Sequence, residues 1–328
     1  MSSVARCLVV GTVPLPDLDL VARLVQPQFV EMTLLPPGRP IPEGEFQVLW
    51  RLFPGRLAGN DPHQFERALD SHPELVWVHT SSAGIDHLAE LFQDRPSITL
   101  THSAGVVAQP IAEFALGCLL QHCKRWDQLR RLQAERRFES LALRELADLR
   151  VAVFGLGAIG SRLAHLLQAA GTTVVGVRRH PSRPVPPGVS RVYPPQQLAN
   201  ACQGADALVL AAPLTQATRH AVGGAVLAAL AEGSVLINVA RGALLDEAAL
   251  APALASGRPA AAYLDAFEEE PLPTDSALWA LAGAYLSPHV SWSSPNFARR
   301  TSQFFGEQLQ RWLRGESLLN RASPSAGY

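Results

Sequence analysis

Polar side chains that could act in catalysis follow three short apolar runs in the second half of the chain. Arg241 comes after the first run, an acidic stretch at 265–270 after the second, and His289 after the third. In an open α/β sheet the ligand site lies outside the carboxyl ends of the strands, so side chains from successive loops can meet there. Each alone also has a plain explanation, as a surface arginine, a solvated acidic loop or a hydrogen-bonded histidine. Together they favour a catalytic site.

A glycine-rich turn lies upstream of these residues. Three glycines form the pattern Gly-x-Gly-x-x-Gly between a β-branched run at 151–154 and apolar positions at helical spacing. The first permits the turn, the second lets the backbone approach a pyrophosphate, and the third lets the helix pack on the strand. The pyrophosphate then meets free N–H groups at the helix N-terminus. A loop merely rich in glycine is the alternative, but the strand–helix–strand order favours a dinucleotide site formed by Gly155, Leu156, Gly157, Ala158, Ile159 and Gly160.

The end of the following strand indicates which dinucleotide binds. An NAD site usually has Asp or Glu about 20 residues beyond the glycines, where it holds the ribose 2′-OH. Here Arg178 and Arg179 stand in that place, with no carboxylate nearby. Guanidinium groups bind a 2′-phosphate bidentately, whereas a carboxylate would repel it. The sequence therefore predicts a preference for NADP(H), with NAD(H) possible. The alternative is that both arginines are solvated loop residues and either cofactor is tolerated.

The elements that must position these residues alternate between strand and helix. In the first hundred residues, strands are expected at 6–10, 46–50, 75–79 and 98–101, and helices at 15–25, 61–71 and 85–92. One long helical pattern runs from Pro110 to Phe138, and a last helix covers 296–313. From residue 151 onward, helices fill the gaps between strands at 151–155, 173–177, 207–210, 235–239, 261–265 and 284–286. This alternation predicts the α/β class with a doubly wound parallel sheet.

Composition excludes several other classes of protein. The chain has 328 residues, of which 48% are hydrophobic, and a net charge of −1, so it is long enough for two domains and has no basic field for nucleic acid or an anionic membrane. The N-terminal apolar run is too short for a membrane span. The four cysteines, Cys7, Cys118, Cys123 and Cys202, lack zinc spacing, and we expect reduced thiols in a cytoplasmic protein with no metal site.

Taken in order, the motifs resemble those of the D-isomer-specific 2-hydroxyacid dehydrogenase family. They stand at 82–87, 111–113, 155–160, 213–218, 238–242, 265–273 and 288–289. The resemblance implies two Rossmann-like doubly wound domains with the active-site cleft between them. Residues 1–101 and 296–328 would form the substrate domain, and residues 102–295 the dinucleotide-binding domain. It also implies a homodimer, with the region 110–138 as the expected interface.

The same resemblance implies catalytic roles for Arg241, Glu270 and His289. Arg241 would bind the carboxylate of a 2-oxo acid and polarise its ketone, and protonated His289 would supply a proton to the ketone oxygen. Glu270 would favour the charged imidazole and orient it. Glu268 and Glu269 are rival carboxylates, but the family's acid precedes a proline, here Pro271.

Further site residues follow from the resemblance. The backbone around Ser82, Ala83 and Gly84 would hold the substrate carboxylate, because small residues let the main chain come close. Asp265 would contact the nicotinamide carboxamide. The cofactor groove would be lined by Pro213, Thr218 and Ala240.

The expected substrate is a small 2-oxo acid such as glyoxylate or hydroxypyruvate, by resemblance to the NADPH-using branch. Trp292 departs from the small residues usual after the catalytic histidine, and would narrow the pocket or pack between domains. Arg51, in the loop 50–55, would favour a second carboxylate or a phosphate; a surface arginine is the alternative. Two rival functions remain open. The chain could be a formate or phosphite dehydrogenase, or it could be an NAD(P)-sensing protein like the corepressors of this fold.

Overall fold

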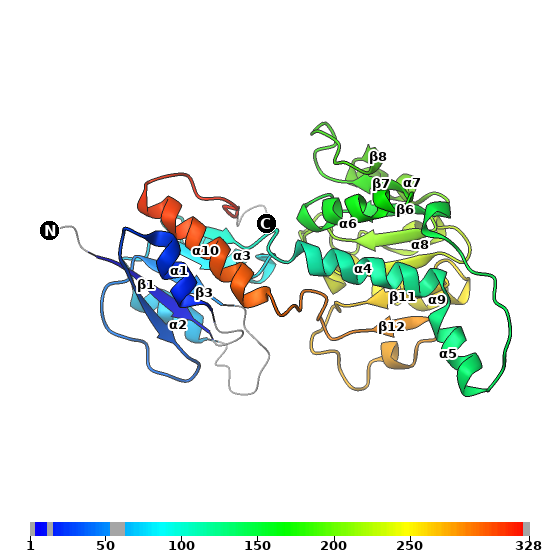
Figure 1. Ribbon diagram of the computed structural model, residues 1–328, viewed down its shortest axis with the longest axis horizontal. Helices are drawn as coiled ribbons and strands as arrows, with labels where there is room; N and C mark the ends of the chain where they lie inside the picture. Colours follow the sequence, from blue (N-terminus) through cyan, green and yellow to red (C-terminus); the bar gives the residue numbers. More distant parts are fainter. Residues whose placement is uncertain (1–3, 12–15, 53–62, 324–328) are drawn as a thin grey trace. The chain divides into compact units, whose positions relative to one another are not determined.

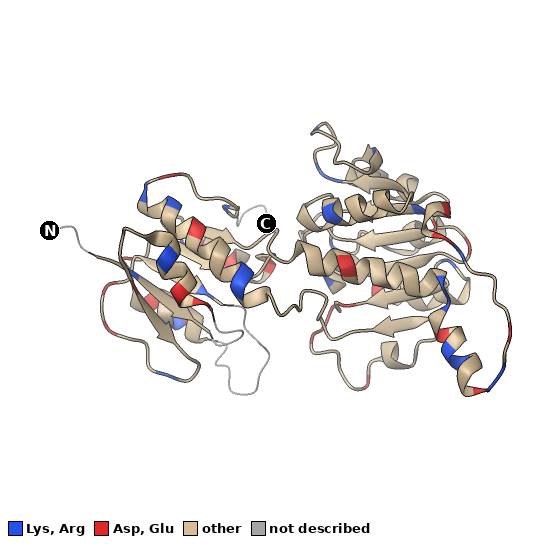
Figure 2. Ribbon diagram, viewed as in Figure 1, with Lys and Arg blue, Asp and Glu red and all other residues tan. Residues whose placement is uncertain are grey.

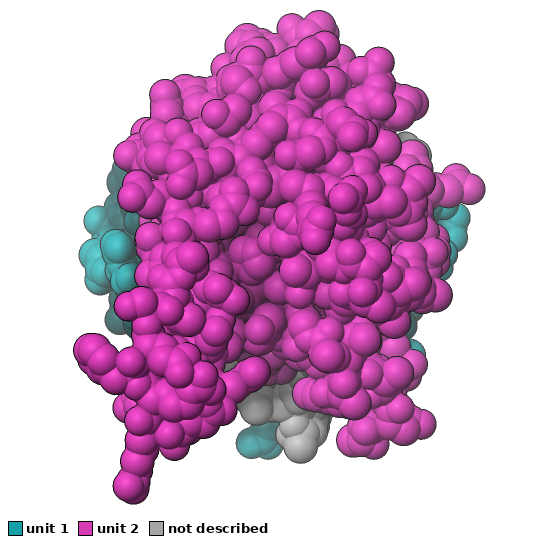
Figure 3. All heavy atoms as spheres, turned by 90° about the vertical axis from the view of Figure 1, so that its right-hand side faces the viewer, with its two compact units in different colours: residues 1–107, 294–328 teal, residues 108–293 magenta. Residues whose placement is uncertain are grey.

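The computed structural model describes residues 4–11, 16–52 and 63–323 and divides the chain into two compact units (Figures 1 and 3). Unit 1 comprises Met1–Val107 and Ser294–Tyr328, and unit 2 comprises Ala108–Ser293. The family resemblance implied divisions after Thr101 and after Pro295. Residues 53–55 of the loop beside Arg51, and the first residues of the helices expected at 15–25 and 61–71, lie outside the described residues.

The described part of unit 1 contains one parallel sheet of five strands. Their order is β2-β1-β3-β4-β5, with bounds β1 (Ala5–Val10), β2 (Val30–Leu35), β3 (Val48–Arg51), β4 (Trp77–Thr80) and β5 (Thr99–His102). The direction of winding reverses between β1 and β3, and the carboxyl ends of such a strand pair are where ligands bind in open α/β sheets. The strand β2 was not predicted. It is an edge strand with partly exposed side chains, so its hydrophobic signal is weak.

Helices cover both faces of this sheet. Successive residues of β1 point to opposite sides, so that Leu8 packs with α2 (Gln64–Ser71) and α3 (Ala89–Gln93), and Val9 with α1 (Leu18–Val25) and α10 (Phe297–Leu313). Phe305 of α10 stacks on Trp50 with ring centroids 4.2 Å apart. The helix α10 is therefore part of the core of unit 1, although the residues of unit 2 separate it in sequence from the other elements of unit 1.

Unit 2 contains, in its described residues, a parallel sheet of seven strands in the order β12-β11-β10-β9-β6-β7-β8. Their bounds are β6 (Arg150–Phe154), β7 (Thr173–Val177), β8 (Val189–Tyr193), β9 (Ala207–Leu210), β10 (Val235–Asn238), β11 (Ala261–Leu264) and β12 (Ala284–Leu286). Winding reverses between β6 and β9. The expected strands are confirmed within one residue at each end, but β8 was not predicted, because exposed residues interrupt the apolar run of this edge strand.

The helices of unit 2 lie in two layers. On one face of the sheet, α4 (Ala108–Cys123) and α6 (Ala158–Ala169) pack together. On the other face, α7 (Leu198–Cys202), α8 (Gly224–Ala228) and α9 (Leu250–Ala255) contribute buried side chains to a hydrophobic core (Figure 1). The single helix expected over 110–138 is wrong. It is broken at Arg125, whose φ of 51° a right-handed helix cannot include, and a second helix, α5 (Trp126–Ala134), follows.

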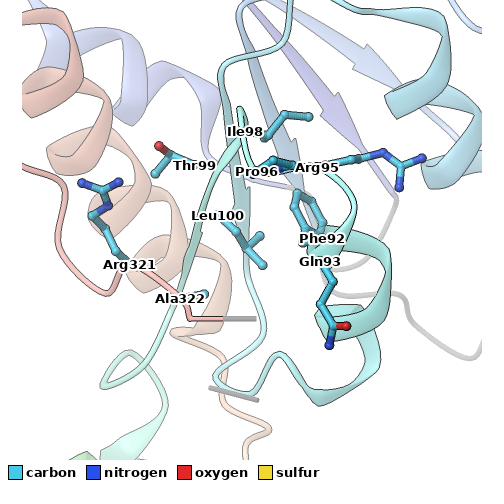
Figure 4. A pocket seen from close by; sticks show the side chains of 9 residues that line it. All are labelled: Phe92, Gln93, Arg95, Pro96, Ile98, Thr99, Leu100, Arg321 and Ala322. Carbon is cyan, nitrogen blue, oxygen red and sulfur yellow. The ribbon is translucent and has the colours of Figure 1, made fainter. Parts of the chain in front are cut away.

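The surface and interior of the described residues hold few special features. Cationic and anionic positions are interspersed over both units (Figure 2), and the four cysteines are free and buried. No described helix is long and apolar enough to cross a membrane, and no described cluster of His, Cys, Asp and Glu could hold a metal ion. An open hollow of about 590 Å³ in unit 1 is lined by α3, the residues that lead into β5, and Arg321 (Figure 4). It lies at the amino end of β5, whereas the predicted site residues follow carboxyl ends.

Candidate active site

Three neighbouring strands of unit 2 lead to the predicted catalytic residues. β10, β11 and β12 are parallel and in register, with Asn238 beside Leu264 and Leu264 beside Leu286. Arg241, Glu270 and His289 stand in the loops that leave these ends. Because parallel neighbours end at the same edge of a sheet, the three loops share one edge.

The imidazole of His289 contacts Glu270 directly. Its Nδ1 lies 3.0 and 3.2 Å from the two carboxylate oxygens, and both side chains are partly buried. The backbone N–H of Phe267 also donates to Glu270, at 2.9 Å, so the carboxylate is held by its own loop. The rival Glu268 instead lies 2.7 Å from Nε2 of His220. With Nδ1 directed to Glu270, Nε2 is the nitrogen available to exchange a proton with a ligand.

Asp265 connects the loops that follow β11 and β12. This buried carboxylate accepts the hydroxyl of Ser287 at 2.6 Å and the backbone N–H of Val290 at 2.9 Å on Oδ1, and the N–H of Ser291 at 2.9 Å on Oδ2. Both oxygens thus bind the loop that carries His289, a role that the sequence analysis missed. The contact spans more than twenty residues of chain, so no local pattern could indicate it. A contact of Asp265 with the carboxamide stays a prediction.

The loop of Arg241 is held against the loop of Glu270. The buried amide of Asn238 donates to the carbonyl oxygen of Arg241 at 2.9 Å and accepts the N–H of Ala240 at 3.1 Å. The next residue, Gly242, lies so close to the backbone of Phe267 and Glu268 that a Cβ there would overlap it. Only glycine allows this approach of the two loops.

The glycine-rich turn has the geometry that a dinucleotide requires. Gly155 has a φ of 105°, and its missing Cβ leaves room for the backbone of Ala211 and Ala212. Gly160 is packed against the carbonyl of Gly155. Gly157 has nothing within 4 Å of its Cβ position, and it begins α6 without a side-chain cap. The residues present therefore fit a pyrophosphate, which would accept the uncapped N–H groups of α6.

The loop between β7 and β8 is basic. The guanidinium of Arg178 donates to the carbonyl oxygens of Arg183 and, at 3.1 Å, Pro184, which closes this loop. Arg179 lies exposed in the same loop. Arg183, which the sequence analysis did not select, brings a third guanidinium, and its position five residues beyond Arg178 was the available signal. Elsewhere at this edge of the sheet, the Thr218 hydroxyl closes the turn after β9 by donating to the carbonyl of Pro213 at 2.8 Å.

In unit 1, the loop after β4 carries Ser82, Ala83 and Gly84, whose backbone is predicted to bind the substrate. Nδ1 of His102 donates to the carbonyl oxygen of Ala83 at 2.8 Å, and the Ser82 hydroxyl donates to that of Gly84 at 2.9 Å. Burial lowers the pKa of His102, which favours the neutral ring. Within the described residues, the N–H groups of Ala83 and Gly84 have no acceptor. The loop is therefore fixed through its carbonyl groups, and its donors remain available to a ligand.

Arg51 stands at the carboxyl end of β3, where winding reverses in unit 1. One guanidinium nitrogen donates to Nε2 of His87 at 3.1 Å, and the group lies 5.0 Å from the ring centroid of Phe65. Burial lowers its pKa to about 10. No carboxylate among the described residues lies within ion-pair distance of it. A desolvated cation of this kind is stabilised by a bound anion.

Comparison with known proteins places this geometry in a family. Residues 116–291 match the family model described as D-isomer specific 2-hydroxyacid dehydrogenase, NAD binding domain. The glyoxylate reductase of Aeropyrum pernix is 30% identical over 77% of this chain and 78% of its own length. A D-isomer specific 2-hydroxyacid dehydrogenase from Xanthobacter autotrophicus Py2, solved with NADPH and MES, has a TM-score of 0.85 at 30% identity and covers 99% of this chain and 100% of its own. The NADPH-dependent glyoxylate/hydroxypyruvate reductase SmGhrA of Sinorhizobium meliloti, solved with NADP and sulfate, has a TM-score of 0.82 at 26% identity, with the same coverage.

Proposed function

The chain belongs to the family of D-isomer specific 2-hydroxyacid dehydrogenases, and from this premise we propose that it reduces a small 2-oxo acid to the D-2-hydroxy acid with NADPH. The observation that carries the proposal is the Glu270–His289 pair, which shares one sheet edge with Arg241 and the glycine-rich turn. An acid, its orienting carboxylate and a guanidinium are what the reduction of a ketone beside a carboxylate requires.

The chain's own residues would divide the work as follows. The nicotinamide, when bound, supplies the hydride. Arg241 binds the substrate carboxylate and polarises the ketone, while His289 delivers a proton from Nε2 to the oxygen that gains charge. Glu270 holds Nδ1 and stabilises the imidazolium before transfer. The N–H groups of Ala83 and Gly84, which have no acceptor among the described residues, would hold the substrate carboxylate.

A preference for NADP(H) is part of the proposal. It is supported by the basic loop after β7, with Arg178, Arg179 and Arg183, and by the two relatives solved with NADPH or NADP. A 2′-phosphate carries the negative charge that such a loop attracts. Movement of the Arg178 side chain away from the carbonyls of Arg183 and Pro184 would free it for this contact.

Glyoxylate and hydroxypyruvate are the first candidate substrates, since two of the relatives described above are named for them. Arg51 supports a second candidate class, 2-oxo acids that carry another anionic group. Its half-buried guanidinium has His87 and Phe65 as neighbours but no described carboxylate within ion-pair distance. We also propose that the enzyme is a homodimer associating through the α4–α5 region.

The test is the rate of NADPH oxidation, followed by absorbance, with glyoxylate, hydroxypyruvate, oxaloacetate and phosphohydroxypyruvate, repeated with NADH. We expect turnover on at least one, with a higher kcat/KM for NADPH than for NADH. Equal or better efficiency with NADH would refute the cofactor preference alone. Oxidation of formate or phosphite with NAD, or tight NADPH binding with no turnover on any acid, would favour the rival functions.

A further inference from the structure

Trp292 lies three residues beyond His289 and has no part in the proposed proton and hydride transfer. Its indole N–H donates to the carbonyl oxygen of His289 at 2.8 Å. The backbone of His289 has a φ of 53°, in the left-handed region that residues other than glycine rarely adopt. A left-handed histidine at the centre of a site implies that its surroundings impose the conformation.

We propose that Trp292 is a positioning residue for His289, and that it acts by holding the peptide group that follows the histidine. The inference rests on the proposed role of His289 as the acid. In this proposal, the indole N–H keeps the backbone of His289 in the left-handed conformation, so that the imidazole Nδ1 remains hydrogen-bonded to the carboxylate of Glu270.

The peptide group between His289 and Val290 is held at both of its ends. Its carbonyl oxygen accepts the indole N–H of Trp292, and its N–H donates to Oδ1 of Asp265 at 2.9 Å. The next N–H, of Ser291, donates to Oδ2 of the same carboxylate. The orientation of this peptide plane sets ψ of His289, and the N–H of His289, which donates to the carbonyl of Ser287 at 2.9 Å, restrains φ. Among these hydrogen bonds between described residues, the one from the indole N–H of Trp292 is the only one that the carbonyl oxygen of His289 accepts.

The consequence for the imidazole follows from geometry. If the carbonyl is released, the backbone of His289 can relax toward the commoner right-handed or extended regions. The Cα–Cβ bond then turns, and Nδ1 leaves the carboxylate oxygens of Glu270 that lie 3.0 and 3.2 Å away. A displacement of about 1 Å in a catalytic group can lower turnover about a hundredfold, so loss of a restraint is expected to affect kcat rather than cofactor binding.

The test compares three variants. Trp292→Phe keeps an aromatic ring and removes the donor. Trp292→Gln places an amide N–H the same number of bonds from Cα and should restore part of the contact. Trp279→Phe is the matched control, because the indole of Trp279 donates to the carbonyl of Pro273 at 2.8 Å in the same unit and makes no hydrogen bond to the described segment 287–293.

We expect Trp292→Phe to lower kcat about tenfold, with the dissociation constant of NADPH, measured by fluorescence, within about twofold of wild type. The limb of the pH–rate profile that reports the acid should move to lower pH, since the imidazolium loses Glu270. Amide hydrogen exchange should accelerate in the segment 287–293. Trp292→Gln should recover part of each change, and Trp279→Phe should show none.

Two results would overturn the inference: a pH–rate limb that stays in place in Trp292→Phe, or exchange in 287–293 no faster than in Trp279→Phe. Failure of the proposed function is distinguishable from either. If the wild type reduces no 2-oxo acid, the assigned reaction is wrong, while faster exchange confined to 287–293 would still support the restraint by Trp292.

Discussion

At the scale of single residues, the proposed reaction depends on the contact between His289 and Glu270. Removing the acid should slow proton delivery without touching the glycine-rich turn. We therefore predict that His289→Gln lowers kcat about a thousandfold, a typical loss for a general acid, and leaves NADPH binding nearly unchanged. Steady-state turnover and a fluorescence titration measure the two effects. Turnover close to wild type would exclude His289 as the acid.

Glu270 acts on the same proton through Nδ1 of the imidazole. Glu270→Gln keeps the size of the side chain but removes the charge that stabilises the imidazolium. We predict that the limb of the pH–rate profile due to the acid moves to lower pH in this variant, since the protonated ring loses its partner. The profile of kcat/KM against pH measures it. Glu268→Gln is the matched control, and a profile that shifts with Glu268 instead would transfer the role to that residue.

A second histidine makes the free energy of unfolding depend on pH. His79 is fully buried between the hydroxyls of Thr101 and Ser103, at 2.8 and 3.0 Å, and burial lowers its pKa from 6.5 to about 3. Above pH 6.5 the ring is neutral in both states. Below it, the unfolded chain binds a proton that the folded protein excludes, so this contribution to stability is lost as pH falls from 6.5 toward about 3.

We predict that the free energy of unfolding of the wild type decreases in this range, with His79 contributing roughly 1 kcal/mol per pH unit. Burial of His102 adds to the decrease in the same direction. Urea unfolding at several pH values measures the slope. His79→Gln, which keeps polar atoms at the site but does not titrate, should show a flatter dependence, and parallel curves for the two proteins would contradict the assignment.

At the scale of elements, the site depends on how closely the loops after β10 and β11 approach. A Cβ at Gly242 would overlap the backbone of Phe267 and Glu268, so Gly242→Ala must push the loop of Glu270 away. We predict a loss of turnover of at least about a hundredfold and a lower unfolding temperature. Gly224→Ala is the control, because α8 begins there with nothing within 4 Å of the added Cβ. Equal turnover by the two variants would show that the loops after β10 and β11 can move apart without loss of activity.

The secondary structure shows which elements local pattern could predict. Buried strands such as β7 and β9 were predicted to the residue, because both of their faces are apolar and the runs are continuous. The edge strands β2 and β8 were missed, since exposed positions interrupt their runs. The break at Arg125 was missed for another reason. The spacing of apolar residues continues through it, and only the φ of 51° separates α4 from α5.

At the scale of the whole molecule, the proposed dimer has a surface that can be tested. α5 and the stretch after it expose Trp126, Leu129 and Phe138, which are apolar side chains that a partner subunit would cover. We predict a dimer by light scattering, and dissociation to the monomer when Leu129 and Phe138 are both changed to Asp. Phe29→Asp, at an exposed apolar residue of unit 1, is the control. A wild-type monomer at working concentration would refute the proposal.

The amino-acid sequence alone predicted the α/β class, the parallel strands around the glycine-rich turn, and the types of residue that follow β10, β11 and β12. These depend on apolar periodicity and on residue chemistry, which are local properties of a chain. Three adjacent glutamates were open as partners of His289 on the residues alone, and resemblance selected Glu270. The tertiary structure decided which of them contacts the imidazole, and that Asp265 and Trp292 hold the histidine loop. Strand register and the path of each loop determine those contacts, and neither can be predicted from the spacing of residues along the chain.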